Sequence, residues 1–336
     1  MSSMDLPFIG RLTAGARDAI SDLAGVTVGH CTLAEGDVQT GVTVVRPHAG
    51  DPYRDRVPAA AVVLNGFGKS VGLVQVEELG VLETPIALTN TFSVAAVAQA
   101  QIRSCIAANP ECGRGLATVN PLVFECNDGF LNDIQRMVVG EPHYLQALAN
   151  ASAQVEEGAV GAGRGMSCFE LKGGIGTASR VAGGHTVGAL VLANFGKLHQ
   201  LRIAGAPVGE TLAGRRASDA SPEKGSIILL LATDAPLDAR QLRRLALRAG
   251  AGLARTGSVF GHGSGDIALA FSTAYTVPLE ATRPMPALAM LHESLIDKLF
   301  EAAADSTEQS ILRALWRATP VTGRDGNQRE ALTDLL

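Results

Sequence analysis

Two continuous apolar runs in the last third of the chain constrain its fold more than any other feature. "SIILLLAT" (226–233) and "DIALAFSTA" (266–274) are bounded by turn residues and are typical of buried strands. Between them, apolar residues recur at helical spacing over 242–253, and Gly257 follows as a C-terminal cap. A strand, a helix and a second strand in this order predict a layered α/β fold.

The rest of the chain interleaves further strands and helices. No strand–helix–strand unit repeats cleanly, which favours a layered α/β fold over a barrel or a doubly wound sheet. We expect a mostly helical tail over 288–316 and an exposed loop over 207–226. The other expected elements are strands within 25–31, 40–47, 59–68, 115–125 and 185–196, a helix over 93–107 that stops at Asn109–Pro110, and a turn in 126–134 followed by the start of a helix.

The length of 336 residues allows either two domains or one large α/β domain, and we expect a single domain over 1–336. Hydrophobic residues make up 46% of the chain, enough for a packed core. A net charge of −5 without any long run of Lys or Arg argues against nucleic-acid binding. The N-terminus lacks a signal-peptide pattern and no apolar run reaches the roughly 18 residues that a membrane span needs. We therefore expect a cytoplasmic protein whose five cysteines are reduced.

Glycine clusters and histidines raise the question of a cofactor or a metal. The segment 158–180 holds seven glycines, but it contains no G-x-G-x-x-G fingerprint, and no Walker A pattern occurs anywhere in the chain. Tight turns and close backbone packing explain this cluster better. The seven histidines are scattered without metal-ligand spacing. We therefore expect neither a cofactor nor a metal.

Ser264, in "GHGSGD" (261–266), could be turn filler, a phosphate cradle or a nucleophile. The G-x-S-x-G pattern of α/β-hydrolases is absent, and His262 is too close in sequence to orient well as a general base. Cleavage of the Gly263–Ser264 bond would give Ser264 a free amine that could accept its own hydroxyl proton. Such chemistry needs a small preceding residue, a backbone that tolerates strain and a rigid strand just after the serine, and all three are present. A simple turn accounts for the same residues.

The helical tail offers two interpretations of Ser306. In one interpretation, Ser306 faces inward among apolar neighbours, because it lies on one helical stripe with Leu295, Leu299, Ala303 and Ser310. Alternatively, "STEQ" (306–309) is a capping box with Ser306 as N-cap, Gln309 at N3 and Glu308 at N2.

Several long motifs resemble those of the DmpA-like L-aminopeptidase/D-esterase-amidase family, which includes β-peptidyl aminopeptidases and the nylon-oligomer hydrolase. The clearest are "VLNGFGKSVGLVQVEELGVLETPIALTNTFSV", "VFECNDGFLNDI", "GAGRGMSCFELKGGIGTASR" and "GSGDIALAFSTA", in the order that the family has them. The resemblance implies a layered αββα sandwich similar to N-terminal-nucleophile hydrolases. It also implies self-cleavage between Gly263 and Ser264, into segments 1–263 and 264–336.

The same resemblance assigns roles to five residues. Ser264 matches the family's nucleophile, and Asn194 matches the asparagine that helps form the oxyanion hole. Glu125 matches the carboxylate that receives the substrate's free amino group. Ser306 and Glu308 match a hydroxyl and a carboxylate around the nucleophile's amine. The implied substrates are small peptides, amides or esters, and the implied assembly is a homo-oligomer.

Two departures from the family pattern leave the substrate preference open among α-L, D-alanyl and β-amino types. Asn127 stands at a substrate-binding position where some members carry a tyrosine, and Lys69 stands where many have glutamate. Two other functions remain open. One is an unprocessed member that serves as a binding or assembly scaffold. The other is acyl transfer like that of ornithine acetyltransferase, although Ser264 and the aminopeptidase motifs count against it because that nucleophile is generally threonine.

Overall fold

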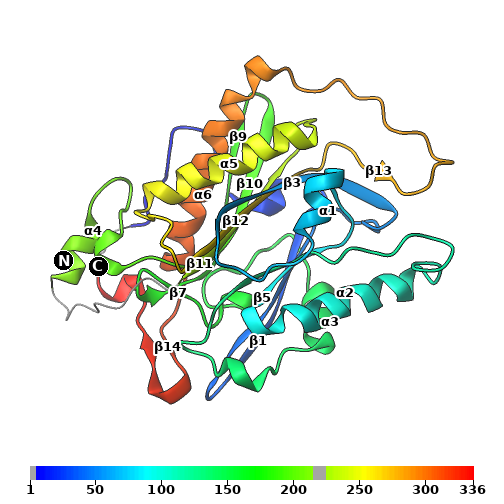
Figure 1. The fold of residues 1–336 in the computed structure, drawn as a ribbon. Coiled ribbons are helices and arrows are strands. Elements are labelled where there is room, and N and C mark those ends of the chain that lie inside the picture. Colours follow the sequence, from blue (N-terminus) through cyan, green and yellow to red (C-terminus); the bar gives the residue numbers. More distant parts are fainter. Residues whose placement is uncertain (1–4, 215–224) are drawn as a thin grey trace.

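Two β-sheets lie face to face between two layers of helices in the computed structural model, which describes residues 5–214 and 225–336 (Figure 1). The larger sheet has the order β13–β3–β12–β11–β10–β9, with β4 paired to β3, and the smaller has the order β1–β2–β5–β6. The larger sheet comprises β3 (Asp55–Gly66), β4 (Val81–Leu82), β9 (Gly174–Ala182), β10 (His185–Asn194), β11 (Ser226–Thr233), β12 (Gly265–Ser272) and β13 (Val277–Pro278). The smaller comprises β1 (Thr27–Glu35), β2 (Val38–Arg46), β5 (Ile86–Asn90) and β6 (Val123–Cys126).

Helices cover the outer face of each sheet (Figure 1). The larger sheet packs against α5 (Ala239–Arg255) and α6 (Asp297–Trp316), and the smaller against α2 (Val94–Ala108) and α3 (Glu141–Ala149). The remaining elements are α1 (Leu73–Leu79), α4 (Val208–Ala213) and two small hairpins, β7 (Ser167–Cys168) with β8 (Leu171–Lys172) and β14 (Val321–Thr322) with β15 (Gln328–Arg329). The predicted layered αββα sandwich is confirmed.

The central strands are apolar throughout because both of their faces are buried. In β10, Val187, Ala189 and Val191 pack toward α5 and α6, whereas Leu190 and Leu192 pack toward the smaller sheet. The strand β11 divides its residues in the same way. A strand buried on both faces loses the usual alternation of apolar and polar residues. This explains the continuous runs in the sequence.

The predicted strand–helix–strand unit at 226–274 is confirmed. Strands β11 and β12 pair in parallel, and α5 connects them across the face of the sheet. Asp238 caps the start of α5 by accepting from Gln241 N at 2.7 Å, and Gly257 follows its end at φ +104°.

Four predicted boundaries were wrong. The expected strand at 115–125 pairs only over β6 because "GLATVNP" forms an irregular segment, and the helix expected after 126–134 is a single 3-10 turn at Ile134–Arg136. That turn ends at Met137, whose backbone is left-handed at φ +45°. The tail becomes α-helical only at Asp297. Within the expected loop 207–226, residues 208–213 form α4, and residues 215–224 lie outside the described part of the chain.

All five cysteines fall in the described ranges, and all five are free thiols. Among the described helices, none combines the length and the apolar character that crossing a bilayer requires.

Two glycines of α5 provide a matched test of how closely the helical layer packs. A Cβ on Gly252 would lie 2.4 Å from Ala304 O and 2.8 Å from Thr307 Cβ, whereas one on Gly250 would meet side-chain atoms of Leu64 at 3.4 Å and of Phe260 at 4.0 Å, which are ordinary contact distances. We expect Gly252→Ala to lower the free energy of unfolding by about 1–3 kcal/mol through overpacking. Gly250→Ala should raise it by up to about 1 kcal/mol, because alanine favours helix. Thermal unfolding midpoints measure both, and equal shifts would show that α6 does not constrain Gly252.

Candidate active site

Four strands of the larger sheet align their ends in one row. Asn194 pairs with Ser226, Ser226 with Gly265 and Gly265 with Gly66. Since neighbouring strands lie about 4.8 Å apart, the Cα atoms of Asn194 and Gly265 are about 10 Å apart. Ser264, directly before Gly265, therefore lies at the same edge of the sheet as Asn194.

Ser264 is buried and firmly held. Only 1% of its surface is exposed, and its amide N–H donates to Gly261 O at 2.9 Å. Its hydroxyl donates to Asp266 Oδ1 at 2.5 Å. A buried hydroxyl at the first turn before a central strand has little freedom, so its Oγ is fixed relative to the preceding peptide bond.

The end of β3 and the residue after it hold the turn that carries Ser264. The amide of Asn65 donates to Gly261 O at 2.8 Å and to Ser264 O at 2.5 Å, on either side of the Gly263–Ser264 bond. Phe67 N also donates to Ser264 O, at 3.3 Å. Sequence reasoning interpreted "NGFG" as the end of a buried strand and as part of a family motif, and it missed this role of Asn65. A buried strand that ends in Asn-Gly was the available signal.

Glu125 lies beside the same turn, although it comes from the smaller sheet. Its side chain in β6 is buried, and its two oxygens accept from Lys69 N at 2.8 Å and from the Thr91 hydroxyl. Gly68 separates Glu125 from β12: a Cβ there would lie 3.6 Å from Glu125 Oε1 and 3.9 Å from Gly265 Cα. The carboxylate is thus aligned by two donors next to Ser264. Sequence reasoning missed Thr91.

Asn194 is oriented from both ends of its side-chain amide. Its Oδ1 accepts from Ser167 N at 2.8 Å, and its Nδ2 donates to Asn127 O at 3.0 Å. An amide nitrogen carries two N–H groups, so a second one is present for another acceptor. The Asn127 side chain accepts from Gly129 N within its own turn, and Asn127 itself is exposed.

The glycine-rich segment holds Ser167 in place. Lys172 is fully buried, and its ammonium donates to the carbonyls of Gly163, Met166 and Gly173 at 2.7–2.9 Å. Burial lowers the pKa of Lys172 well below its usual value. A Cβ on Gly163 or Gly173 would lie within 3.0 Å of neighbouring backbone, so the predicted close packing is confirmed. Lysine and glycines together fix the loop that orients Asn194.

Lys69 contacts Glu125 through its backbone. Its ammonium instead lies 4.4 Å from the centre of the Phe67 ring. Any residue other than proline supplies the backbone N–H, so lysine in place of glutamate preserves the alignment of Glu125.

Ser306 is not a helix N-cap, because it lies inside α6. Its hydroxyl donates to Ala302 O at 2.7 Å, one turn back along the helix. Gln309 is also inside the helix and accepts from Ile9 N at 2.8 Å. The inward stripe is the correct interpretation for Ser306, which is fully buried, but Leu295 at its start is exposed.

Neither Ser306 nor Glu308 hydrogen-bonds Ser264 within the described part of the chain. The Ser306 hydroxyl bonds inside its own helix, and a Cβ on Gly252 of α5 would lie 3.1 Å from Glu308 N. Glu308 forms an ion pair with Arg255 of α5 at 3.6 Å. Burial raises the pKa of Glu308, and Arg255 opposes that effect.

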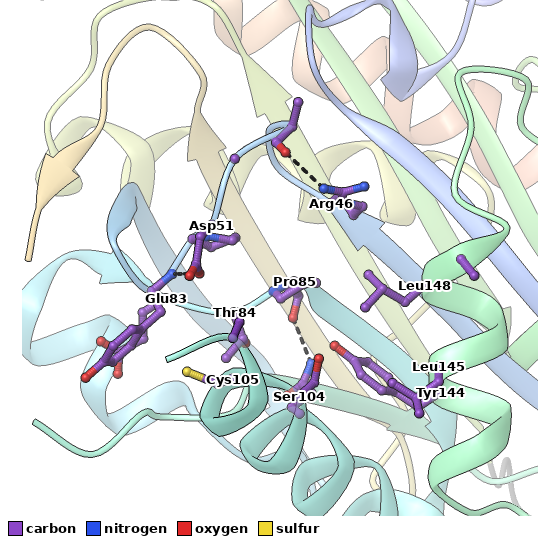
Figure 2. Close-up of a pocket in the computed structure, with 17 residues that line it drawn as sticks. Arg46, Asp51, Glu83, Thr84, Pro85, Ser104, Cys105, Tyr144, Leu145 and Leu148 are labelled. Carbon is purple, nitrogen blue, oxygen red and sulfur yellow. Dashed lines mark hydrogen bonds between the residues drawn. The ribbon is translucent and has the colours of Figure 1, made fainter. Parts of the chain in front are cut away.

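A pocket of about 610 Å³ opens elsewhere, between α2, α3 and the segments that follow β2 and β4 (Figure 2). Its polar groups pair locally: Gln101 donates to Pro85 O at 2.8 Å and Arg46 to Ala49 O at 3.0 Å. The one thiol in it, Cys105, has its pKa raised to about 12 by burial and by neighbouring Cys112, so it is a poor nucleophile. Within the described ranges, no three metal-ligating side chains cluster to hold a metal ion.

Asp128, just beyond Glu125 on the chain, makes the stability of this region depend on pH. It is fully buried, accepts from Asn132 Nδ2 at 3.0 Å, and burial raises its pKa to about 7. Because the folded pKa exceeds the unfolded one, stability from this group is greatest at low pH and falls as pH rises to about 7.

We expect Asp128→Asn, which keeps the shape and the acceptor for Asn132, to remove that loss. The gain in unfolding free energy over wild type should grow between about pH 4 and pH 7, by up to about 1.4 kcal/mol per unit, and be constant above. Unfolding midpoints of both proteins across this range measure it. A difference that does not vary with pH would mean that Asp128 ionises in the folded protein as it does in the unfolded chain.

Comparisons with known proteins show that the whole chain is similar to aminopeptidases in sequence and in fold. A β-peptidyl aminopeptidase, BapA, from Sphingosinicella microcystinivorans is 40% identical over 96% of this chain and 87% of its own length. Two solved structures superpose with a TM-score of 0.90. One is a β-aminopeptidase from Burkholderia sp., 45% identical over 96% of this chain and 93% of that one. The other is an L-aminopeptidase D-Ala-esterase/amidase from Ochrobactrum anthropi, 36% identical over 97% and 93%, whose fold is a variant of the Ntn-hydrolase fold.

The resemblance identified from the motifs is therefore confirmed, and the chain shares that fold. The model of peptidase family S58 matches residues 18–329, nearly the whole chain, and this protein belongs to that family.

Proposed function

We propose that this S58 peptidase is a self-processing serine aminopeptidase that acts on short peptides, amides or esters with a free amino terminus. The observation that carries the proposal is the position of three buried residues, Ser264, Asn194 and Glu125, at one edge of the sandwich. The relatives named as β-peptidyl aminopeptidases make substrates with an N-terminal β-amino acid the first to try.

Each of the three residues has one task in the proposed reaction. After cleavage before Ser264, its α-amine, with a reference pKa near 8, accepts the hydroxyl proton and later returns it to the leaving group. The second N–H of Asn194 stabilises the charge that develops on the attacked carbonyl oxygen. Glu125 binds the substrate's ammonium and so fixes the distance between the amino terminus and the bond that is cut.

Roles for Ser306 and Glu308 near the Ser264 amine stay predictions from the family resemblance: the Ser306 hydroxyl donates to Ala302 O within α6, and Glu308 forms an ion pair with Arg255 of α5. Assembly into a homo-oligomer stays a prediction from the family resemblance.

Self-cleavage is the first test. Scaling the 34.7 kDa mass by residue number predicts fragments of about 27 kDa (1–263) and about 7.5 kDa (264–336), the smaller one beginning Ser-Gly-Asp-Ile-Ala. Intact mass measurement under denaturing conditions, with N-terminal sequencing, detects both. Ser264→Ala should give one uncut chain without amidase activity. A folded wild-type chain that stays uncut would leave the scaffold interpretation standing.

The role of Glu125 is tested by changing its charge alone. In Glu125→Gln the amide oxygen can still accept from Lys69 N, and the amide nitrogen can donate to the Thr91 hydroxyl. We expect kcat/KM for a dipeptide amide with a free amine to fall by about 10²–10³, the usual cost of removing one partner of a buried ion pair. Hydrolysis of the matching ester without an amino group should change by less than tenfold. Equal losses on both substrates would contradict ammonium binding.

A further inference from the structure

The free amine of Ser264 cannot catalyse its own release. In the uncut chain the Ser264 nitrogen is an amide, and its N–H donates to Gly261 O at 2.9 Å. An amide nitrogen has no basic lone pair, so the first attack of Ser264 Oγ needs another proton acceptor. We infer that Asp266 is the general base of self-cleavage, an inference that rests on the proposed function.

The geometry of Asp266 suits this task. Its Oδ1 accepts directly from Ser264 Oγ at 2.5 Å, within the reach that general-base catalysis requires. Among the described residues, it is the one titratable side chain that hydrogen-bonds this hydroxyl. It is 1% exposed, so little water competes for the same proton.

Asp266 is also held rigidly. It lies at the second position of β12 and pairs with Ile227 of β11 on one side and with Asn65 of β3 on the other. Asn65 donates to the carbonyls of Gly261 and Ser264. The base and the turn that contains the scissile bond are therefore both held by β3.

The neighbouring alternatives fit less well. The exposed His262 ring lies beside Phe67, with 6.3 Å between ring centres, and makes no hydrogen bond to Ser264 in the described structure. The Ser226 hydroxyl donates to Gly225 O at 2.8 Å and accepts from Gly265 N at 3.2 Å. Neither group is placed to take the Oγ proton.

The proposed step balances as follows. Ser264 Oγ bonds to the carbonyl carbon of Gly263 while its proton passes to the Asp266 carboxylate. The C–N bond between Gly263 and Ser264 then breaks, and the nitrogen takes that proton to become a free amine. An ester now links Gly263 to Ser264 Oγ. Water hydrolyses this ester, which leaves a carboxylate on Gly263 and the free hydroxyl on Ser264.

The test is a cleavage time course of the full chain made by cell-free synthesis with a short labelling pulse. Asp266→Asn keeps the size and an oxygen acceptor but cannot take the proton. We expect its cleavage to slow by about 10²–10⁴, the usual contribution of a general base. Asp266→Glu keeps a carboxylate and should cleave faster than Asp266→Asn. Cleavage of Asp266→Asn at the wild-type rate, or the opposite order of the two variants, would overturn the inference.

Two further measurements separate the outcomes. Neutral hydroxylamine cuts esters and leaves amides intact. It should therefore release no 264–336 fragment from uncut Asp266→Asn, because no ester has formed. Release of the fragment would show that Asp266 acts on a step after ester formation, and it would overturn the role of Asp266 in the first step. The unfolding midpoint of Asp266→Asn should match that of Ser264→Ala, which is also uncut. A wild-type chain that never cleaves would instead refute the proposed function.

Discussion

The parallel pairing of β11 with β12 is the constraint on which the rest of the site depends. Its register places Gly265 opposite Ser226, and the antiparallel β10 then places Asn194 in the same row. A shift of one residue in β12 would turn Ser264 and Asp266 to the other face of the sheet. Burial on both faces makes such a shift costly, because every apolar side chain of the strand would change layers as well.

The second requirement is a precise backbone around polar groups that are out of water. Asn65, Thr91 and Ser167 each use one donor to hold a reacting group or its carbonyl neighbour. Lys172 stabilises the loop of Ser167 with three hydrogen bonds to carbonyls, each of which would lose one hydrogen bond if the side chain were smaller or apolar. These supports come from side chains and backbone groups in separate segments, and few of them have a distinctive sequence pattern.

This explains how much the sequence could predict. Apolar runs and helical spacing were enough to predict the layered fold, because burial of one or both faces of an element determines which of its positions are apolar. The irregular segments at 115–122 and 134–137 were missed, because their conformation depends on local backbone contacts and on one left-handed residue, Met137. Ser264 was found from its position before a strand. Asp266 and Thr91 were not, because no pattern reveals which side chain will face a hydroxyl. The capping box at 306–309 failed because the surrounding apolar stripe continues the helix through it.

The position of β12 in the middle of the larger sheet has a consequence for the lifetime of the folded protein. A cut before Ser264 leaves β12 hydrogen-bonded to β3 and β11, and α6 packed on β9 and β10, so the two pieces stay together without a covalent link. Once separated by denaturation, they would have to find each other as a bimolecular reaction, with their apolar faces open to aggregation. The intact precursor meets no such obstacle. The lifetime of the folded, cut protein would then depend on its rate of unfolding rather than on an equilibrium. Only the uncut chain could fold efficiently, so each molecule would assemble once.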